Sequence, residues 1–294
     1  MKGLLLTNAF AINEHIEFQS NSFIKEFNLL GVDLIHKTNS ELLVYINNDG
    51  DIAKRFNEYD FILYFDKDKY IGKMLEKVGC SLINSSSSVE ACDDKMLTHI
   101  LLANNGVKMP RTISYPLCYE YHNNIEPVIA SVLKAFNFPF IIKENFGSLG
   151  KQVYLVKNKE ELMLLENKLR YVPHLYQEFI SESIGVDYRL ILIGNKVVSA
   201  MKRSNDSNFV ANIGSGGKGE TYIPDTRMKE IAIKASKILG LDYCGIDFVI
   251  NSLGEPVLLE VNSNAFFKEI DKINNINIPE IFAKYVIEKV KNID

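Results

Sequence analysis

Two acidic residues and an asparagine near the end of the sequence could form a metal site. They lie on two apolar, β-branched segments joined by a turn-rich connection, a pattern that predicts a β-hairpin. A pairing of Ile250 with Val257 would set the register of this hairpin. Asp247 would then lie directly opposite Glu260, and Asn262 would share a face with Glu260. Two like charges this close repel each other unless a cation lies between them.

The types of these side chains indicate which metal they would bind. Oxygen ligands that include two carboxylates suit Mg²⁺ or Mn²⁺ better than zinc. We therefore expect Asp247, Glu260 and Asn262 to hold metal, and phosphates are the usual partners of such a magnesium site. In the alternative interpretation, the carboxylates lie on a solvated face of the hairpin and bind no metal. The hairpin alone does not decide between the two.

Upstream segments carry possible phosphate and nucleotide contacts. The loop over residues 144–151 joins two predicted strands, and Gly147 and Gly150 would let its backbone approach a phosphate as a flap. A simple glycine turn explains the same residues. Lys143 ends an otherwise apolar strand, so its ammonium group either points at a phosphate or reaches solvent. The strand end over residues 177–180 could hydrogen-bond an adenine edge.

Composition and charge limit the classes of function. The chain has 294 residues, enough for two or three domains, and 47% hydrophobic and 24% charged residues are typical of a globular protein. The net charge of -4 does not indicate nucleic-acid binding. No apolar run approaches the roughly 20 residues that span a bilayer. The short apolar run at 3–6 fits a first core strand better than a signal peptide.

The cysteines and histidines show no metal-ligand spacing. The cysteines are scattered and lack a CxxC pattern, which predicts buried thiols in a reducing compartment, and we expect a cytoplasmic protein. We interpret the histidines as structural or surface residues. The residues in question are Cys80, Cys92, Cys118, Cys244, His15, His36, His99, His122 and His174.

The first part of the chain alternates between strand and helix patterns, which predicts a small parallel α/β sheet. Ser87 and Glu90 have capping-box spacing and predict the start of a helix, and a further helix is expected from Lys95 to about Asn104. The expected strands are 4–6, 32–35, 61–65 and 81–83, and the expected helices before Ser87 are 22–30 and 70–78.

Two further units follow. The expected strands are 140–143, 152–156, 175–180, 188–193 and 196–201 before the hairpin, and the expected helices are 160–169, 228–239 and a last one that begins at Pro279. The fold class is therefore α/β, with α+β character in the C-terminal part. We predict three domains, over residues 1–90, 91–183 and 184–294.

Taken together and in order, these motifs resemble the ATP-grasp superfamily and, within it, the RimK-like carboxylate–amine ligases. The similarity extends over most of residues 80–265, whereas residues 1–80 match only in pattern. The motifs that carry it are Cys92-Asp93-Asp94-Lys95, 106–112, 139–143 with the flap at 147–150, Gln177-Glu178-Phe179-Ile180, 185–189, 200–203, Asn212 with Gly216-Gly217, 245–247 and 260–263.

The resemblance implies an ATP-grasp fold, with an N-terminal parallel-sheet domain and a nucleotide bound between two α+β subdomains. Lys95 and Lys143 would hold the ATP phosphates, and the flap with Ser148 and Gly150 would close over them. Asp187 would lie in the nucleotide site near the ribose. The segment that would bind adenine is Gln177, Glu178, Phe179 and Ile180.

The resemblance also implies the residues of the reaction centre. Two Mg²⁺ ions would be bound, with Mn²⁺ as the alternative metal and Glu260 bridging the ions. Arg203 and Asn212 would face the transferring phosphate and the acyl group, and Arg189 with Arg203 could stabilise the acyl phosphate. For Arg189, an ion pair on the strand surface explains the residue equally well. The metal ligands would be Asp247, Glu260 and Asn262.

These roles imply an ATP-dependent ligase that joins a carboxylate to an amine through an acyl phosphate. The expected partners are ATP, a carboxylate and an amine belonging to an amino acid, peptide or protein end, with no nucleic acid and no membrane. A homo-oligomer is left open. Two other functions fit the same residues. They are an ATP-binding regulatory or scaffolding module without ligation, and an ATP-dependent kinase that releases a phosphorylated product.

Two segments depart from the pattern of the glutamate-adding members. Those members carry an Arg two residues before the Asn and a His-Arg pair before Gly-Gly, whereas this chain has Val210 and Gly214-Ser215. Fewer cations near the acyl site weaken the case for a glutamate substrate. After Asn262, the segment 263–267 replaces the usual Ser-Pro-Gly. This segment could shape an acceptor pocket. Alternatively, its two aromatic residues, Phe266 and Phe267, belong to the core, which is the interpretation that we favour.

Overall fold

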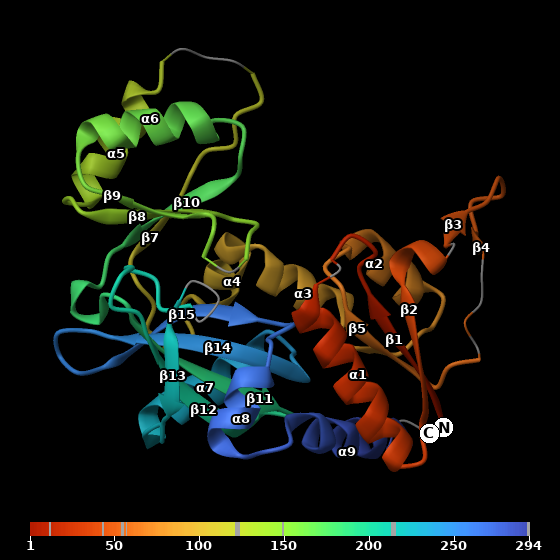
Figure 1. Ribbon diagram of the computed structural model, residues 1–294. Helices are drawn as coiled ribbons and strands as arrows, with labels where there is room; N and C mark the ends of the chain where they lie inside the picture. The colour runs from red at the N-terminus through yellow and green to blue at the C-terminus, as the bar shows by residue number, and fades with distance from the viewer. Residues whose placement is uncertain are drawn as a thin grey trace.

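The structure is a computed structural model that describes residues 1–11, 13–42, 44–53, 56, 58–120, 124–148, 150–212 and 216–292. The described residues form three larger sheets, each with its own helices, and a small two-stranded sheet of β3 and β4 (Figure 1). The first of the larger sheets is parallel and the other two are antiparallel, so the predicted mixture of α/β and α+β architecture is confirmed. No helix in the described ranges is long and apolar enough to cross a membrane.

The N-terminal sheet is parallel and has the strand order β2-β1-β5-β6. Successive residues of a strand point to opposite faces, so Leu5 packs with residues of one helix and Leu4 with residues of another. Helices α1 and α2 therefore cover opposite faces of the sheet. The elements are β1 (Lys2–Thr7), α1 (Glu14–Leu29), β2 (Asp33–Thr38), a 3-10 helix (Asn39–Glu41), β3 (Tyr45–Ile46), β4 (Ile52–Ala53), β5 (Phe61–Phe65), α2 (Lys69–Lys77) and β6 (Leu82–Ile83).

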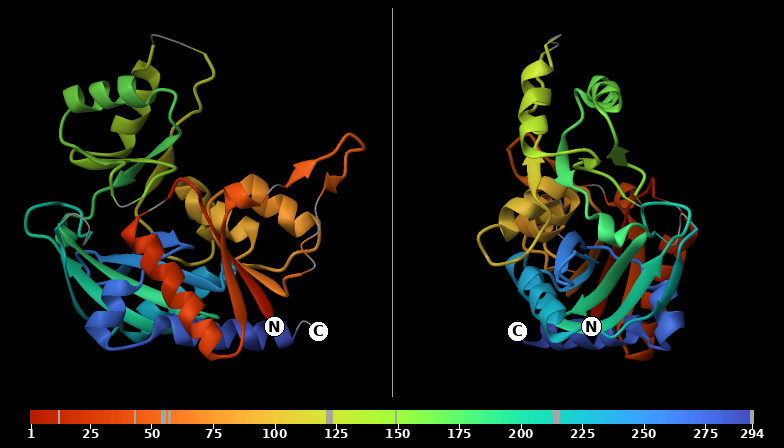
Figure 2. Two further views of the ribbon diagram at one scale, coloured as in Figure 1. Left: turned by 45° about the vertical axis from the view of Figure 1, so that its right-hand side comes forward. Right: turned by 90° about the vertical axis from the view of Figure 1, so that its left-hand side faces the viewer.

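The central sheet is antiparallel, with the order β7-β10-β8-β9. Phe140, Ile142 and Tyr176 pack against the helices of this unit, so the alternate residues Lys143 and Gln177 belong to the opposite face, which carries none of these helices among the described residues. The further views in Figure 2 show this unit standing apart from the C-terminal sheet. Its elements are β7 (Thr112–Ser114), α5 (Glu126–Ala135), β8 (Phe140–Glu144), β9 (Val153–Val156), α6 (Lys159–Leu169) and β10 (His174–Glu178).

The C-terminal sheet is antiparallel, with the order β13-β12-β11-β14-β15. Leu190 and Leu192 are buried with residues of α7, whereas Ile191 and Ile193 are buried with residues of α8 and α9. The elements are a 3-10 helix (Ser181–Ser183), β11 (Val186–Ile193), β12 (Lys196–Ser204), β13 (Lys218–Thr221), α7 (Thr226–Ile238), β14 (Tyr243–Ile250), β15 (Pro256–Asn262), α8 (Lys268–Asn274) and α9 (Ile278–Lys291).

The N-terminal and C-terminal sheets share one apolar core. The buried cluster around Phe23 of α1 and Leu5 of β1 continues to Tyr243 of β14 and Phe282 of α9. The ring centroids of Phe23 and Phe282 lie 5.4 Å apart. Phe267 belongs to this core, so one of the two aromatic residues after the hairpin is a core residue. This packing fixes the edge of the parallel sheet relative to the hairpin.

Two short helices, α3 (Ser86–Asp93) and α4 (Lys95–Leu102), connect the N-terminal sheet to the central unit. The capping box predicted for Ser87 and Glu90 is wrong. The N-cap is Ser85, whose side chain accepts a hydrogen bond from the Ser88 amide, so the helix begins two residues earlier than that spacing required. Glu90 pairs with Lys73 of α2 instead.

Several other expectations differ in extent from the structure. The helix expected at 22–30 begins at Glu14, because Asn13 accepts hydrogen bonds from two backbone amides and caps it. The sequence patterns missed α5, α8, β3, β4, β7 and β13. All four cysteines are free thiols, and Cys92 and Cys244 are buried as expected, whereas Cys80 and Cys118 are partly exposed.

We predict that Asn84→Ala lowers the free energy of unfolding by about 3 kcal/mol, because it leaves buried backbone groups without partners. Asn84 is 2% exposed and joins the end of β6 to the C-terminal sheet. Its Oδ1 accepts from the amides of Asp242 and Tyr243, and its Nδ2 donates to the carbonyls of Tyr243 and Ser263. Urea unfolding measures the change, with the exposed Asn48→Ala as the control. Equal stability of the two variants would contradict the prediction.

Candidate active site

The acidic hairpin is formed by β14 and β15, and its two carboxylates face each other as predicted. The predicted register near the turn is wrong, however, because Ile250 pairs with Pro256 and not with Val257. A β-bulge follows, in which β15 contributes one extra residue, and it restores the pairing of Asp247 with Glu260. The bulge therefore decides which side chains of the hairpin meet.

Asp247 is neutralised by two guanidinium groups. Arg189 on the neighbouring strand donates from Nε and Nη2 to the two carboxylate oxygens at 2.7 and 2.6 Å. Arg203 Nη2 lies 3.0 Å from Asp247 Oδ2. Burial raises the pKa of Asp247, but Arg189 and Arg203 outweigh this effect and hold the pKa at about 2. Asp247 is therefore a carboxylate at neutral pH, with arginines as its cations.

A second buried carboxylate extends this arrangement. Asp187 accepts from Nε and Nη2 of Arg203 at 2.5 and 2.7 Å. The pairs follow the strand register, since Asp187 lies opposite Arg203 and Arg189 lies opposite Asp247. We call Asp187, Arg203, Asp247 and Arg189 the charge ladder. Arg189 thus forms an ion pair, but the pair is largely buried and does not lie on the strand surface.

The other carboxylate of the hairpin faces two lysines from different elements. Lys95 is the first residue of α4, and its Nζ lies 3.8 Å from Glu260 Oε1 and donates to the Gly147 carbonyl at 3.0 Å. Lys143 of β8 is buried. The pKa of Lys143 is lowered to about 8, mainly by burial and also by the charge of Lys95, although Glu260 and Asp247 oppose the shift. The charges of both lysines therefore act on the acidic hairpin.

The glycine loop lies against both Lys95 and Asn212. The Ser148 amide donates to Gln152 Oε1 at 3.2 Å, which shapes the turn. Gly150 has a φ of +73°, and a Cβ atom there would lie 2.7 Å from Asn212 Nδ2, so only glycine allows this approach. The loop and Asn212 are thereby brought together. Leu149 of the flap and Gly214-Ser215 lie outside the described residues, as does His122.

The expected adenine segment uses its side chains for internal contacts. Gln177 is buried, and its Nε2 donates to His99 Nε2 at 3.0 Å and to Thr112 Oγ1 at 3.1 Å. Burial, aided by Lys143, lowers the pKa of His99 to about 4, so its imidazole is neutral. Glu178 is exposed and accepts from the Arg111 amide at 3.1 Å. Phe179 and Ile180 follow directly, which leaves backbone groups at this strand end as the candidates for adenine.

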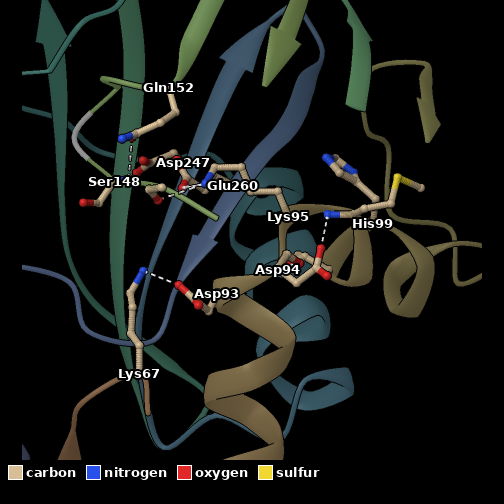
Figure 3. A network of polar contacts seen from close by, with 12 residues as sticks. Lys67, Asp93, Asp94, Lys95, His99, Ser148, Gln152, Asp247 and Glu260 are labelled. Carbon is tan, nitrogen blue, oxygen red and sulfur yellow. Dashed lines mark hydrogen bonds and ion pairs between the residues drawn. The ribbon is translucent and has the colours of Figure 1, made fainter. Parts of the chain in front are cut away.

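Sequence reasoning missed several residues of this polar network. Figure 3 shows Gln152, His99, Lys67 and Asp93 together with Lys95 and the two hairpin carboxylates. Lys67 Nζ donates to Asp93 Oδ1 at 2.6 Å. Asp93 belongs to the motif that identified Lys95, so the sequence could have placed Asp93 beside the site. Nothing in the sequence linked Lys67 to the site.

The donor set fits a hard cation with phosphate. Asp247, Glu260 and the Asn262 amide supply oxygen ligands, which suit Mg²⁺. Asn262 Nδ2 is buried and has no hydrogen-bond acceptor among the described residues, so a group bound beside it has to offer an acceptor, as a phosphate oxygen does. No group of three His, Cys, Asp or Glu within the described ranges could hold a metal, so this set depends on the amide.

A glycine flap and two lysines beside an acidic antiparallel hairpin of the C-terminal sheet are typical of an ATP-grasp protein. The RimK-like ATP-grasp domain model matches residues 92–286, and the chain belongs to that family. N-acetylaspartylglutamate synthase A from Homo sapiens is 34% identical over 229 residues, which cover 77% of this chain and 57% of that protein. A probable alpha-L-glutamate ligase from Legionella pneumophila (strain Corby) is 34% identical over 222 residues, 74% of this chain and 71% of that protein.

A further relative and two solved structures also resemble this chain. Beta-citrylglutamate synthase B from Homo sapiens is 35% identical over 222 residues, 75% of this chain and 56% of that protein, so the chain spans a little over half of the two human relatives. D-alanine–D-alanine ligase from Bacillus anthracis, complexed with ATP, has a TM-score of 0.73 at 16% identity and covers 100% of this chain and 99% of that one. The ATP-grasp ligase PsnB with its minimal precursor gives 0.70 at 16% identity, with 97% and 98% covered. The predicted ATP-grasp fold is confirmed.

We predict that ATP affinity falls as the pH rises through about 8, because Lys143 then loses the proton that attracts phosphate. Lys143→Gln is expected to weaken ATP binding about tenfold and to remove this part of the pH dependence. Calorimetric titration of ATP between about pH 6.5 and 9.5 measures both effects. Lys157→Gln, an exposed lysine change on the same unit, is the control. An unchanged pH profile in Lys143→Gln would separate Lys143 from the phosphates.

Proposed function

We propose that this protein is an ATP-dependent carboxylate–amine ligase that forms an amide bond through an acyl phosphate. The observation that carries the proposal is the convergence of Lys95 and Lys143 on the Glu260–Asp247 hairpin beneath a glycine flap. Membership of the RimK-like ATP-grasp family and the named ligases among the relatives support it. We also propose that the domains divide at residues 1–90, 91–183 and 184–294.

The reaction needs an activated carboxylate, because a free carboxylate has no leaving group for an amine to displace. A carboxylate oxygen attacks the γ-phosphorus of ATP, the bond from that phosphorus to the β-phosphate oxygen breaks, and ADP leaves. The amine nitrogen then attacks the acyl carbon, the bond to the phosphate oxygen breaks, and the nitrogen releases a proton. The products are an amide, ADP and phosphate.

In this proposal the two lysines hold the ATP phosphates and the flap covers them. Lys95 donates to the Gly147 carbonyl of the flap. The same ammonium group would therefore bind a phosphate and hold the flap. Ser148 and Gly150 contribute flap backbone, and Asp187 lies near the ribose. Backbone groups of the segment 177–180 bind the adenine edge.

Asp247, Glu260 and Asn262 would hold Mg²⁺, which neutralises the phosphate oxygens when bound. We propose two ions, with Glu260 between them and Mn²⁺ as a substitute. Asp247 is engaged by Arg189 in the present structure, so metal binding at Asp247 requires the guanidinium of Arg189 to share or release this carboxylate. A released Arg189 then becomes available to an acyl phosphate.

Arg189, Arg203 and Asn212 are the proposed contacts of the reacting groups. The arginines lie on adjacent strands of the charge ladder and direct positive charge to the face that carries Asp247. Positioned cations stabilise the negative charge of the acyl phosphate and of the tetrahedral oxyanion. Asn212 lies against the flap, where it can reach the transferring phosphate or the acyl group.

The substrates are proposed as a class. The relatives are named for glutamate-containing products or for glutamate ligation. This chain has Val210 where glutamate-adding members carry an arginine, so we propose an amino acid, peptide or protein end as carboxylate or amine without fixing it as glutamate. We further propose a cytoplasmic location from the cysteine usage, and a homo-oligomer remains open to measurement.

We predict that magnesium-ATP releases ADP only when a particular carboxylate and a particular amine are both present. A matrix of amino acids and short peptides tests this, with ADP and amide quantified together. Glu260→Ala is expected to lose at least about 99% of the activity, because a carboxylate at the phosphates is removed. Glu288→Ala, an exposed acid on α9, is the control and keeps wild-type activity.

The outcomes separate the candidate functions. Full ligation by Glu260→Ala would contradict the metal assignment. A phosphorylated product that accumulates without an amine would identify a kinase. ATP binding without turnover across the matrix would favour a regulatory or scaffolding module. In such a module Asp247 would stay paired with Arg189, as it is in this structure.

A further inference from the structure

The parallel N-terminal sheet has a topological switch point between β1 and β5. The chain passes from β1 to β2 on one side and then crosses to β5 on the other side of β1. In open parallel sheets, ligands bind in the crevice outside the carboxyl ends of the strands at such a point. Here these ends are Thr7-Asn8 and Phe65-Asp66. Asn8 Nδ2 donates to Asp66 Oδ1 at 3.0 Å and spans the crevice.

Asp66 is a buried carboxylate with one oxygen in use. The residue is 4% exposed, and besides Asn8 its Oδ1 accepts from the amides of Lys67 and Asp68 at 2.6 and 3.2 Å. Its Oδ2 is buried and has no hydrogen-bond donor among the described residues. A buried carboxylate oxygen without a donor is costly. The fold therefore keeps an acceptor ready at the switch point.

A second unused acceptor lies against the same strand end. Asn264 Nδ2 donates to the carbonyl of Phe65, the residue before Asp66, at 3.3 Å, and this bond holds the Asn264 amide at the end of β5. Asn264 Oδ1 is buried and, within the described ranges, has no donor. Asn264 follows Asn262 of the acidic hairpin by two residues. The crevice is thus joined directly to the proposed reaction centre.

The neighbouring lysine does not supply the missing donor. Lys67 directs its ammonium group to Asp93 at 2.6 Å, and Asp93 lies two residues before Lys95 (Figure 3). The strand end that carries Asp66 is therefore linked through Lys67 and Asp93 to the start of α4, where Lys95 lies. Two acceptor oxygens, one of them charged, require a ligand group that is positive and carries several N–H donors. A primary ammonium group meets both requirements.

We propose that the crevice formed by Asn8, Asp66 and Asn264 binds the ammonium group of the amine substrate, with Asp66 Oδ2 and Asn264 Oδ1 as its acceptors. The inference rests on the proposed ligase function and assigns one of its two substrates to the N-terminal sheet. Asp66 acts in binding and orientation. The ammonium group gives up one proton to solvent before its nitrogen attacks the acyl carbon.

The test uses Asp66→Asn, which keeps one oxygen for Asn8 and the backbone amides but replaces the second acceptor by an NH₂ donor. The matched control is Asp33→Asn, the same change at an exposed position at the amino end of β2. We expect the KM for the amine to rise at least about tenfold in Asp66→Asn, the magnitude of losing a hydrogen bond to a charged group. The KM values for ATP and the carboxylate stay within about twofold.

Hydroxylamine separates amine binding from acyl phosphate formation. It is a small neutral nucleophile that converts an acyl phosphate to a hydroxamate and phosphate without an ammonium group to be recognised. Asp66→Asn is therefore expected to form hydroxamate at the wild-type rate while amide formation with the natural amine declines. Equal losses with both nucleophiles, an unchanged amine KM, or a rise in the carboxylate KM instead would overturn the proposal.

Direct binding keeps this test independent of turnover. Calorimetric titration of L-glutamate, then of the other amino acids of the matrix, into the ATP-bound protein is expected to give binding that Asp66→Asn loses and Asp33→Asn keeps. If wild-type protein forms neither amide nor hydroxamate but shows this difference, the ligase proposal fails and the ammonium site stands. If no amino acid binds, the site fails. Asn264→Leu, which removes the second acceptor, repeats the comparison if Asp66→Asn does not fold.

Discussion

The site depends on how four charges are buried on one face of the C-terminal sheet. Buried carboxylates are costly unless each meets a cation with good geometry. In the charge ladder each acid meets at least one guanidinium group, and the cross-strand register of β11 with β12 and β14 produces these pairs. Removal of Arg203 would leave the buried Asp187 without its guanidinium partner, whereas removal of Arg189 would leave Asp247 paired with Arg203 alone. The ladder therefore holds the strands in register and also presents Asp247 to the site.

Local sequence patterns predicted most of the fold. Alternating apolar runs predicted β1, β5, β8 and both hairpin strands, because each is buried on two faces or alternates in the way a sheet requires. The first and last residues of the helices and strands were harder to predict from the sequence. The start of helix α1 is defined by the Asn13 cap, and β13 is a short edge strand without an apolar face. Such elements depend on tertiary partners that local composition does not reveal.

The candidate site was predictable as a set of residues but not as a set of contacts. The resemblance named Lys95, Lys143 and the acidic hairpin, and the structure brings them together. It did not reveal that a bulge, not the turn, aligns the hairpin, or that Gln177 hydrogen-bonds to His99. Both depend on how distant segments pack, which no motif encodes.

The central unit has a core of its own, made only of residues between Ile113 and Tyr176 in the described ranges, whereas the other two sheets share one core. The central unit meets the rest of the molecule through polar groups such as Gln177–His99 and Lys95–Gly147. Water can replace polar contacts at small cost, but it cannot replace apolar ones. A separation of the central unit from the rest of the molecule would therefore leave both of these apolar cores covered.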